Sequence, residues 1–229
     1  MIPWQAEGPY AVAFTTRNGG VSEGPFDSLN LGGQRDEPHN IAENRRRACA
    51  EIGADAMRLA VNRQRHTAIV HAAEDVHEGQ DGDAIWVSAP GVPILALTAD
   101  CVPIAVARRG DHDPRLAVVH AGWRGLASGI VHNAAAVLGD GPLQAAIGPA
   151  IGPCCYEVGT DVSNLFDADL TRACHLDLWA AAERALQNAG VETITRIDLC
   201  TRCNPNLFYS HRRDGELRGV QGVIGAVTL

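Results

Sequence analysis

The stretch Arg115–Gly129, RLAVVHAGWRGLASG, joins an apolar run rich in β-branched residues to a glycine-bracketed turn and the start of a helix. His120 lies where the strand should end, and Arg124 lies where the helix should begin. Ligands of α/β proteins bind where strand ends face helix N-termini, whose free N–H groups and positive dipole end suit a phosphate. We therefore predict a metal-capable imidazole and an anion-capable guanidinium on one rim, with simple packing of His120 as the alternative.

A second segment, Pro93–Arg108 (PILALTADCVPIAVAR), reads as a buried strand that is interrupted by an acid beside a thiol. Such local conflicts tend to mark functional sites. His66 precedes another short apolar run and is a third candidate. His66, Cys101 and His120 together would leave one position of a zinc ion open, as catalytic zinc sites do. Their spacing alone does not bring the three side chains together.

The composition limits the classes of protein to consider. The chain has 229 residues, 46% of them hydrophobic but only 5% aromatic, so its core must be aliphatic. A formal net charge of −8 argues against nucleic acid as a partner. No apolar run approaches the roughly 20 residues of a membrane helix, and the start lacks the pattern of a signal peptide. We expect a cytoplasmic protein whose seven cysteines are free thiols or metal ligands.

Strands and helices are interleaved along the chain without strict alternation, which favours mixed sheets over a doubly wound parallel sheet. We predict an α/β (mixed α+β) fold: a single layered domain over residues 1–229, with mixed β-sheets flanked by helices. Leu143–Ile147 and Val220–Val227 are typical strand segments. A helix is expected from Asn40, as part of a capping box, to about Ile52. Another is expected to run from the turn after His120 through Leu138.

Four of the remaining cysteines form two close pairs. Cys200 and Cys203 have the C-x-x-C spacing of a redox pair or of half a zinc site. No second C-x-x-C exists, and a closed zinc site needs four ligands. We therefore interpret both as packing thiols. The vicinal pair Cys154 and Cys155 is interpreted as small residues facing the core.

Several polar residues are candidates for binding a substrate. Arg17 and Asn30 lie in turn-forming segments, where they either complete the turns or hold a sugar or phosphate. His211 and Arg212 form a possible anion clamp, because guanidinium groups match phosphate with two hydrogen bonds. Asp100 is a candidate acid or base, although a buried acid can equally cap backbone groups.

The motifs that carry a family resemblance run along most of the chain. They are Thr15–Ser22 (TTRNGGVS), Ser28–Gly32 (SLNLG), Asn44–Arg45 (NR), Gln64–His66 (QRH), Thr98–Cys101 (TADC), His120–Gly125 (HAGWRG), Ile147–Pro149 (IGP), Tyr156–Gly159 (YEVG) and Ser210–Arg213 (SHRR). With them the chain resembles the bacterial laccase-domain family, also described as polyphenol oxidase-like proteins, peptidoglycan editing factors and multifunctional purine nucleoside phosphorylases. The resemblance implies that His66, Cys101 and His120 are metal ligands. Arg65 departs from the family pattern and adds a charge beside the first of them.

The resemblance also implies a chemistry: phosphorolysis of adenosine, inosine and methylthioadenosine, with deamination of adenosine. The expected cofactor is Zn²⁺, with Cu²⁺ possible, and the expected partners are a purine nucleoside and phosphate, with protein partners left open. We assign catalytic roles to Asp100 and Arg124. Substrate binding is assigned to Arg17, Asn30, Gln64, His211 and Arg212.

Three alternatives to this assignment come from other functional classes. A copper-dependent polyphenol oxidase is disfavoured, because the nine histidines include no His-x-His pair and the only methionines, Met1 and Met57, are poorly placed as axial ligands. A cysteine hydrolase would use Cys101 as nucleophile and His120 as base. A peptidoglycan-precursor editing factor would bind its ligand without turning over nucleosides.

Overall fold

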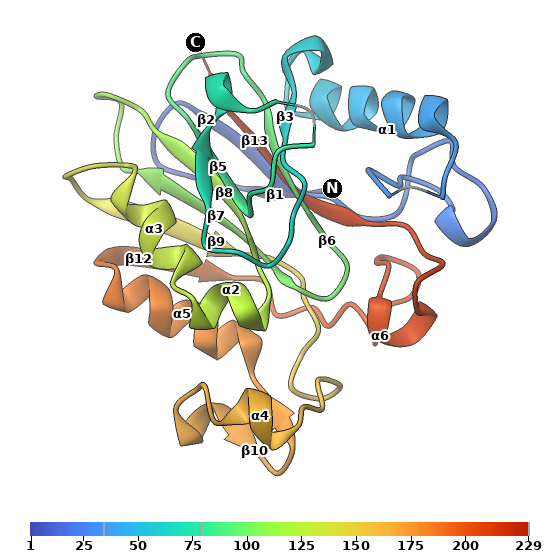
Figure 1. Cartoon of the computed structure of the whole chain (residues 1–229). Helices are drawn as coiled ribbons and strands as arrows, with labels where there is room; N and C mark the ends of the chain where they lie inside the picture. Colours follow the sequence, from blue (N-terminus) through green and yellow to red (C-terminus); the bar gives the residue numbers. More distant parts are fainter. Residues whose placement is uncertain (34, 78, 229) are drawn as a thin grey trace.

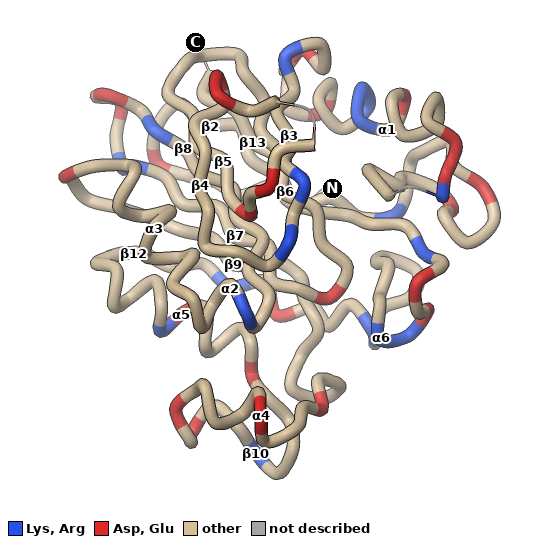
Figure 2. Tube along the Cα trace, in the orientation of Figure 1, with Lys and Arg blue, Asp and Glu red and all other residues tan. Residues whose placement is uncertain are grey.

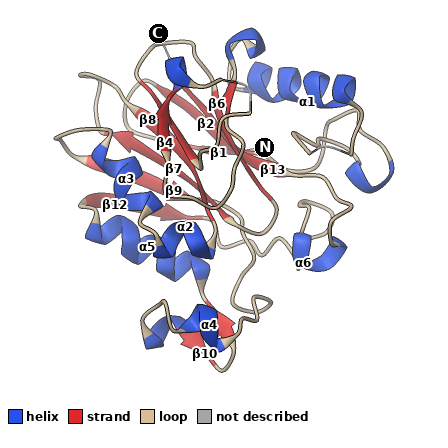
Figure 3. Ribbon diagram, viewed as in Figure 1, coloured by secondary structure: helices blue, strands red, loops and turns tan. Residues whose placement is uncertain are grey.

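A computed structural model of the chain describes residues 1–33, 35–77 and 79–228. Two β-sheets pack face to face, and helices cover the outer face of each (Figure 1). Figure 3 shows the strands gathered in the centre with the helices around them. The predicted class, a mixed α+β fold with layered mixed sheets, is confirmed. The assignment of residues 1–229 to a single domain stays a prediction.

The first sheet has five strands. Their order is β1 (Ile2–Trp4), β2 (Tyr10–Phe14), β13 (Gln221–Val227), β6 (Ile94–Thr98) and β3 (Ala60–Val61). Strands β1, β2, β13 and β6 pair antiparallel, and β3 pairs parallel with β6. The sheet is therefore mixed, as the sequence predicts.

The second sheet has six strands. Their order is β12 (Val191–Arg196), β9 (Leu143–Ile147), β7 (Val102–Arg108), β8 (Leu116–Ala121), β5 (Ala84–Val87) and β4 (Val70–Ala72). Strand β7 pairs antiparallel with both β8 and β9, whereas the outer pairs β12–β9 and β4–β5 are parallel. A separate two-stranded ribbon joins β10 (Thr171–Arg172) to β11 (His175–Leu176).

Helices lie on both outer faces and in a small lobe. The helices are α1 (Pro38–Glu51), α2 (Trp123–Ala127), α3 (Ile130–Ala136), α4 (Thr160–Ser163), α5 (Leu178–Asn188) and α6 (His211–Asp214), and the 3₁₀ turns are η1 (Gly24–Phe26), η2 (Ala56–Arg58), η3 (Ala73–Asp75) and η4 (Ala168–Leu170). Helix α1 packs on the five-stranded sheet, and α3 and α5 pack on the six-stranded sheet. Figure 1 shows α4 and β10 apart from the sheets. No helix among the described residues is long and apolar enough to cross a membrane.

The side-chain alternation of the central strands explains the layers. In β7, Val102, Ile104 and Val106 face the helices, while Ala105 and Ala107 face the other sheet. Successive side chains of a strand point to opposite faces, so a strand buried on both faces is apolar throughout. This explains why the segment lacks the polar alternation of a half-exposed strand.

The interruption that the sequence shows at Thr98–Cys101 is a crossover between the sheets. Strand β6 ends at Thr98 in the five-stranded sheet, and β7 begins at Val102 in the six-stranded sheet. Asp100 adopts φ = 94°, a left-handed conformation that is uncommon for a side chain other than glycine. The crossover places Asp100 and Cys101 at the open end of the layer between the two sheets.

Two helix predictions are wrong in detail. The helix expected to run through Leu138 is split into α2 and α3, because Gly129 adopts φ = 85° and ends the first helix. The expected capping box at Asn40 does not form, because α1 already begins at Pro38, whose fixed φ suits the first helical position.

Asn44 of α1 fixes the loop that precedes the helix. Its side chain accepts a hydrogen bond from the Val21 N–H (2.9 Å) and donates to Ser22 Oγ (2.9 Å) and to the carbonyls of Ser28 (3.2 Å) and Asn30 (2.9 Å). The side chain is completely buried. Gly33, two residues beyond the short Leu-Asn-Leu segment held in this way, lines the main cavity.

We expect Asn44→Ala to lower the free energy of unfolding by about 2–3 kcal/mol, because it leaves several buried polar groups without a partner. Urea denaturation measures the change. Glu51→Ala, on the exposed end of the same helix, is the control and should stay within about 0.5 kcal/mol of the unaltered protein. Equal stabilities of the two variants would contradict the role assigned to Asn44.

Candidate metal centre and active site

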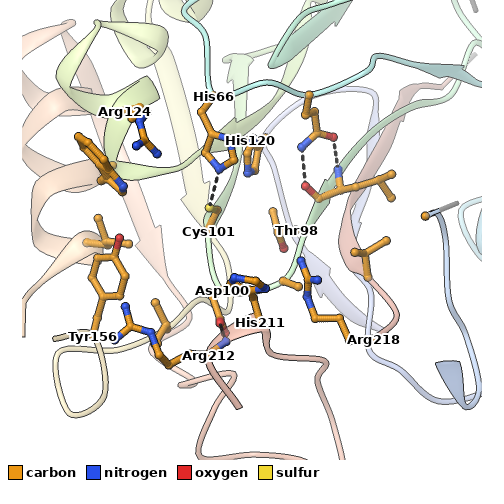
Figure 4. A pocket seen from close by; sticks show the side chains of 18 of the residues that line it. His66, Thr98, Asp100, Cys101, His120, Arg124, Tyr156, His211, Arg212 and Arg218 are labelled. Carbon is orange, nitrogen blue, oxygen red and sulfur yellow. Dashed lines mark hydrogen bonds between the residues drawn. The ribbon is translucent and has the colours of Figure 1, made fainter. Parts of the chain in front are cut away.

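A cavity of about 660 Å³ opens where the two sheets end, and its lining includes residues of α2 and α6. Figure 4 shows the side chains that line it. Eight of the ten site residues expected from the sequence line it: Gln64, His66, Asp100, Cys101, His120, Arg124, His211 and Arg212. Figure 2 shows basic positions at α2 and around α6. Arg124 of α2 and Arg212 of α6 line this cavity. An overall acidic chain therefore presents a locally basic pocket.

Three ligand-type side chains meet at one side of the cavity. The candidate ligand atoms of His66, Cys101 and His120 all lie within 4.8 Å of one another. His66 Nε2 is 3.7 Å from Cys101 Sγ, and the two imidazole rings contact edge to face with their centroids 4.8 Å apart. The three residues come from a loop, the sheet crossover and the end of β8, and the fold brings them together.

The register of β7 and β8 sets part of this geometry. Pro103 pairs with His120, and Val102 pairs with Ala121, so Cys101 lies beside the end of β8. Gly122 follows at once, and a Cβ atom there would lie 2.6 Å from His66 Cδ2 and 3.0 Å from Cys101 Sγ. Only glycine leaves room for this close approach. This explains why the HAGWRG motif has a glycine directly after the strand.

A buried carboxylate that the sequence analysis missed organises the site. Asp83 has a side chain that is 0% exposed, and its Oδ1 lies 2.7 Å from His120 Nδ1. The same carboxylate accepts hydrogen bonds from the backbone N–H groups of Arg65 (3.2 Å), His66 (3.0 Å) and Thr67 (2.6 Å) and from Thr67 Oγ1 (2.7 Å). Asp83 thus fixes both the orientation of the His120 ring and the loop that carries His66. In the sequence, Asp83 ends the acidic stretch Glu74–Asp83, which is typical of a loop, and for this reason it was not selected.

The charges at this site reinforce one another. Burial alone would raise the pKa of Cys101, but the adjacent His120 and the hydrogen bonds from both imidazoles lower it to about 6. Burial lowers the pKa of His120, but Cys101 and Asp83 raise it to about 9. Hydrogen bonds from His120 and Thr67 outweigh burial and hold the pKa of Asp83 well below its usual range. The thiolate, which is the form that binds metals, is therefore favoured at neutral pH.

Asp100 is committed to backbone positioning. Its Oδ1 accepts a hydrogen bond from Thr201 Oγ1, and its Oδ2 accepts one from the Arg212 N–H, each at 2.6 Å. Its own carbonyl accepts a hydrogen bond from the Ile151 N–H at 2.9 Å. Asp100 therefore joins the sheet crossover to α6 and to the loop after β9, which corresponds to the capping alternative considered from the sequence.

Two of the arginines on the rim stack on aromatic rings. The guanidinium carbon of Arg124 lies 4.1 Å from the centroid of the Trp123 ring, and that of Arg212 lies 5.2 Å from the Tyr156 ring. Arg212 also donates to the Glu157 carbonyl at 3.0 Å. Such stacking holds a cation in place while leaving its N–H groups available.

Arg218 and Thr98 are further cavity residues that the sequence analysis missed. The Nε of Arg218 and the Oγ1 of Thr98 are buried, and neither has a hydrogen-bond partner among the described residues. Burial lowers the pKa of Arg218. Unpaired buried polar groups are costly in a folded protein, so these two are candidates for contacts with a ligand. Thr98 lies in the TADC motif but was assigned no role, and Arg218 lies in none of the motifs.

Gln64 and His211 line the cavity with part of their hydrogen-bonding capacity already used. Gln64 donates to the Leu97 carbonyl (2.6 Å) and accepts from the Leu97 N–H (2.7 Å), so it extends the edge of β6. His211 Nδ1 lies 3.2 Å from the Gly215 carbonyl. The other ring nitrogen of His211 remains for a ligand.

Arg17 and Asn30 lie outside the cavity lining. Asn30 is completely buried, where it donates to Asp36 Oδ2 (2.8 Å) and accepts from the Val220 N–H (2.8 Å). Arg17 donates to the carbonyls of Asp27 (2.7 Å) and Pro205 (3.0 Å). Both side chains hold loops together, which is the turn role considered from the sequence.

The comparison with protein families extends over nearly the whole chain. Residues 11–227 match the family described as multi-copper polyphenol oxidoreductase laccase. The sequence is 33% identical over 224 residues to purine nucleoside phosphorylase YfiH of Escherichia coli, covering 92% of this chain and 91% of that protein. It is 38% identical over 235 residues to a purine nucleoside phosphorylase of Deinococcus radiodurans, covering 93% and 88%.

Solved structures agree with this relationship. The fold matches a Neisseria meningitidis protein with a TM-score of 0.89 and 32% sequence identity, covering 99% of this chain and 97% of that one. It matches YlmD of Geobacillus stearothermophilus with a TM-score of 0.87 and 30% identity, covering 96% and 93%. Both the sequence match and the fold match extend over nearly the whole chain. The chain therefore belongs to the laccase-like polyphenol oxidoreductase family, which includes the proteins named purine nucleoside phosphorylase YfiH and YlmD.

Proposed function

We propose that this protein is a metal-dependent purine nucleoside phosphorylase, which cleaves adenosine, inosine and methylthioadenosine with phosphate and also deaminates adenosine. The observation that carries the proposal is the convergence of His66, Cys101 and His120 on one side of a cavity whose rim is lined with arginines. The names of several relatives, which are 33–38% identical, agree with the phosphorylase part of this proposal.

The donor set fits a zinc ion with one open coordination position. Two imidazoles and a thiolate are ligands that suit zinc, and Asp83 orients His120 as a carboxylate partner does in many zinc sites. The separation of 3.7 Å between His66 Nε2 and Cys101 Sγ is close to the roughly 3.5 Å expected between nitrogen and sulfur ligands of tetrahedral zinc. The same ligands also suit copper. When bound, the metal supplies Lewis-acid stabilisation of charge that develops on the substrate.

The residues of the chain position the two substrates. Phosphorolysis forms a bond between a phosphate oxygen and the anomeric carbon of the sugar, breaks the glycosidic bond, and leaves its electron pair on the purine, which takes up a proton. Arg124 and Arg212 would hold the phosphate, because their stacked guanidinium groups are preorganised cations. Burial raises the pKa of Tyr156 to about 12, so its hydroxyl stays protonated and can donate a hydrogen bond.

The phosphate contact proposed for Arg124 depends on its guanidinium more than on a helix dipole. Helix α2 extends only over Trp123–Ala127, so few peptide dipoles align behind the site. The cavity of about 660 Å³ lies within the usual range for small-molecule sites, roughly 300–1,000 Å³. It is large enough for a nucleoside beside a phosphate.

A cysteine hydrolase is the second candidate, because one feature of the site favours it. Cys101, His120 and Asp83 have the order of a nucleophile, a base and an orienting carboxylate, and the Cys101 pKa is low. His66 has no place in such a triad, yet its Nε2 contacts the same sulfur. Two results together would reject the hydrolase: zinc protects Cys101 from alkylation, and the protein turns over nucleosides.

We expect the protein to lose the metal of this cavity when any one of the three ligands is removed, in His66→Ala, Cys101→Ala or His120→Ala. Metal analysis of the purified proteins measures the loss. His132→Ala, which changes an exposed histidine of α3, is the matched control and should keep the metal. Full retention in all three variants would contradict the assignment.

Asp83→Asn should weaken metal affinity by about 10- to 100-fold, because the amide no longer fixes the His120 ring as a carboxylate does. Competition with a chromophoric chelator measures the affinity. A variant that folds and binds the metal as tightly as the unaltered protein would show that the contact between Asp83 and His120 is not needed at the metal.

Arg124→Ala should raise the KM for phosphate about ten- to a hundredfold while leaving the metal bound, because one charge-assisted contact to phosphate is lost. The measurement is release of free base from adenosine and inosine at varied phosphate concentration. Arg46→Ala, on the exposed face of α1, is the control. Equal base release without phosphate would indicate a hydrolase, and no turnover with the metal bound would favour the peptidoglycan-factor alternative.

A further inference from the structure

Four cysteines form a second cluster behind the wall of the cavity. The Sγ atoms of Cys154, Cys155, Cys200 and Cys203 all lie within 4.8 Å of one another. The fold brings the vicinal pair beside the C-x-x-C pair, so four thiols meet where the sequence alone offers two. The expected core position of Cys154 is wrong. Cys154 and Cys203 are exposed rather than packed in the core.

The distances within the cluster match a single tetrahedral ion. Cys203 Sγ lies 3.4 Å from Cys155 Sγ and 3.7 Å from Cys154 Sγ. A zinc–sulfur bond of about 2.3 Å implies a separation of about 3.8 Å between the sulfurs of a tetrahedral site. In a disulfide each cysteine bonds to a single partner, whereas Cys203 lies beside two thiols at once.

The backbone at the cluster stabilises the thiolate of Cys200. The Gly152 N–H donates to Cys200 Sγ at 3.3 Å, a contact that stabilises negative charge on sulfur. A Cβ at Gly152 would lie 2.8 Å from the Trp179 ring, so glycine is required where the backbone approaches this sulfur. The Thr201 N–H donates to the Ala150 carbonyl at 2.9 Å and joins the two cysteine-bearing segments.

We propose that Cys154, Cys155, Cys200 and Cys203 bind a structural zinc ion, in a closed site separate from the cavity. All four ligands are sulfur, and four protein ligands leave no position for a substrate, as in structural zinc sites. The proposal does not depend on the phosphorylase function.

The zinc would fix one wall of the cavity. Ile151 and Tyr156, which line the cavity, lie in the segment that carries the first two ligands. Thr201, between the other two ligands, donates to Asp100, and its carbonyl accepts from Arg213 NH1 at 2.9 Å. Metal binding would therefore join the loop after β9 to the crossover and to α6, so its role is to position Tyr156 and Arg212.

The test counts zinc in protein purified under reducing conditions. We expect two zinc ions per chain, one retained in His66→Ala, one retained in Cys203→Ser, and none in the double variant. Cys174→Ser, which changes an exposed cysteine outside the cluster, should keep both. X-ray absorption at the zinc edge of His66→Ala should show four sulfur neighbours at about 2.3 Å.

A measurement on the unaltered protein covers the case in which Cys203→Ser does not fold. The thiols that react with a thiol reagent are counted before and after a strong chelator removes the zinc. Removal of zinc from the cluster should expose four further reactive thiols, and removal of the metal from the cavity should expose Cys101 as well. A disulfide within the cluster, iron in place of zinc, or loss of all zinc in His66→Ala would overturn the proposal.

Discussion

The hydrogen bonds accepted by the Asp83 carboxylate are the contact on which the candidate site depends. A carboxylate with a fully buried side chain is tolerated only where donors surround it, because burial of an unpaired charge costs several kcal/mol. Three successive backbone N–H groups, from Arg65 to Thr67, supply donors, and His120 supplies another. The same anion thereby bends the loop that presents His66, whose φ is 63°, and orients the His120 ring. One residue couples two of the three proposed ligands.

The sheet crossover provides the third ligand and explains why the site lies where it does. Because β6 and β7 belong to different sheets, the residues between them must pass the open end of the layer that the sheets enclose. The end of β8 lies there too, in the register that pairs Pro103 with His120. A thiol and an imidazole from separate segments therefore meet at the entrance to the layer between the sheets. The interior of this layer is apolar, and its entrance reaches solvent. Such a position combines a low local dielectric, which strengthens electrostatic contacts, with access for a substrate.

Much of this arrangement was predictable from sequence, and the limits have physical causes. Local patterns identified the class of fold, the end of the strand at His120 and the anomaly at Asp100 and Cys101, because these depend on neighbouring residues. Asp83, Thr98 and Arg218 escaped notice, since their importance comes from burial and partners that only the tertiary structure creates. The four-cysteine cluster was missed for the same reason: its halves are separated along the chain by β12 and α5. Arg17 and Asn30 lie in family motifs, yet their contacts are with loops.

The two sides of the cavity rest on different supports. His66, Cys101 and His120 depend on Asp83 and on the six-stranded sheet, whereas Tyr156 and Arg212 depend on Asp100 and on the segments joined at the cysteine cluster. The chain contains no lysine, so the Lys and Arg positions on the rim are all arginines, and two of these are stacked on aromatic rings. Because a stacked guanidinium loses less freedom on binding an anion than a free one does, the side proposed to bind phosphate would be preorganised without the metal. A substitution that disrupts the contacts holding one side of the cavity should therefore weaken ligand binding on that side first. On the proposed function, this separation would allow metal affinity and phosphate affinity to be varied independently in one fold.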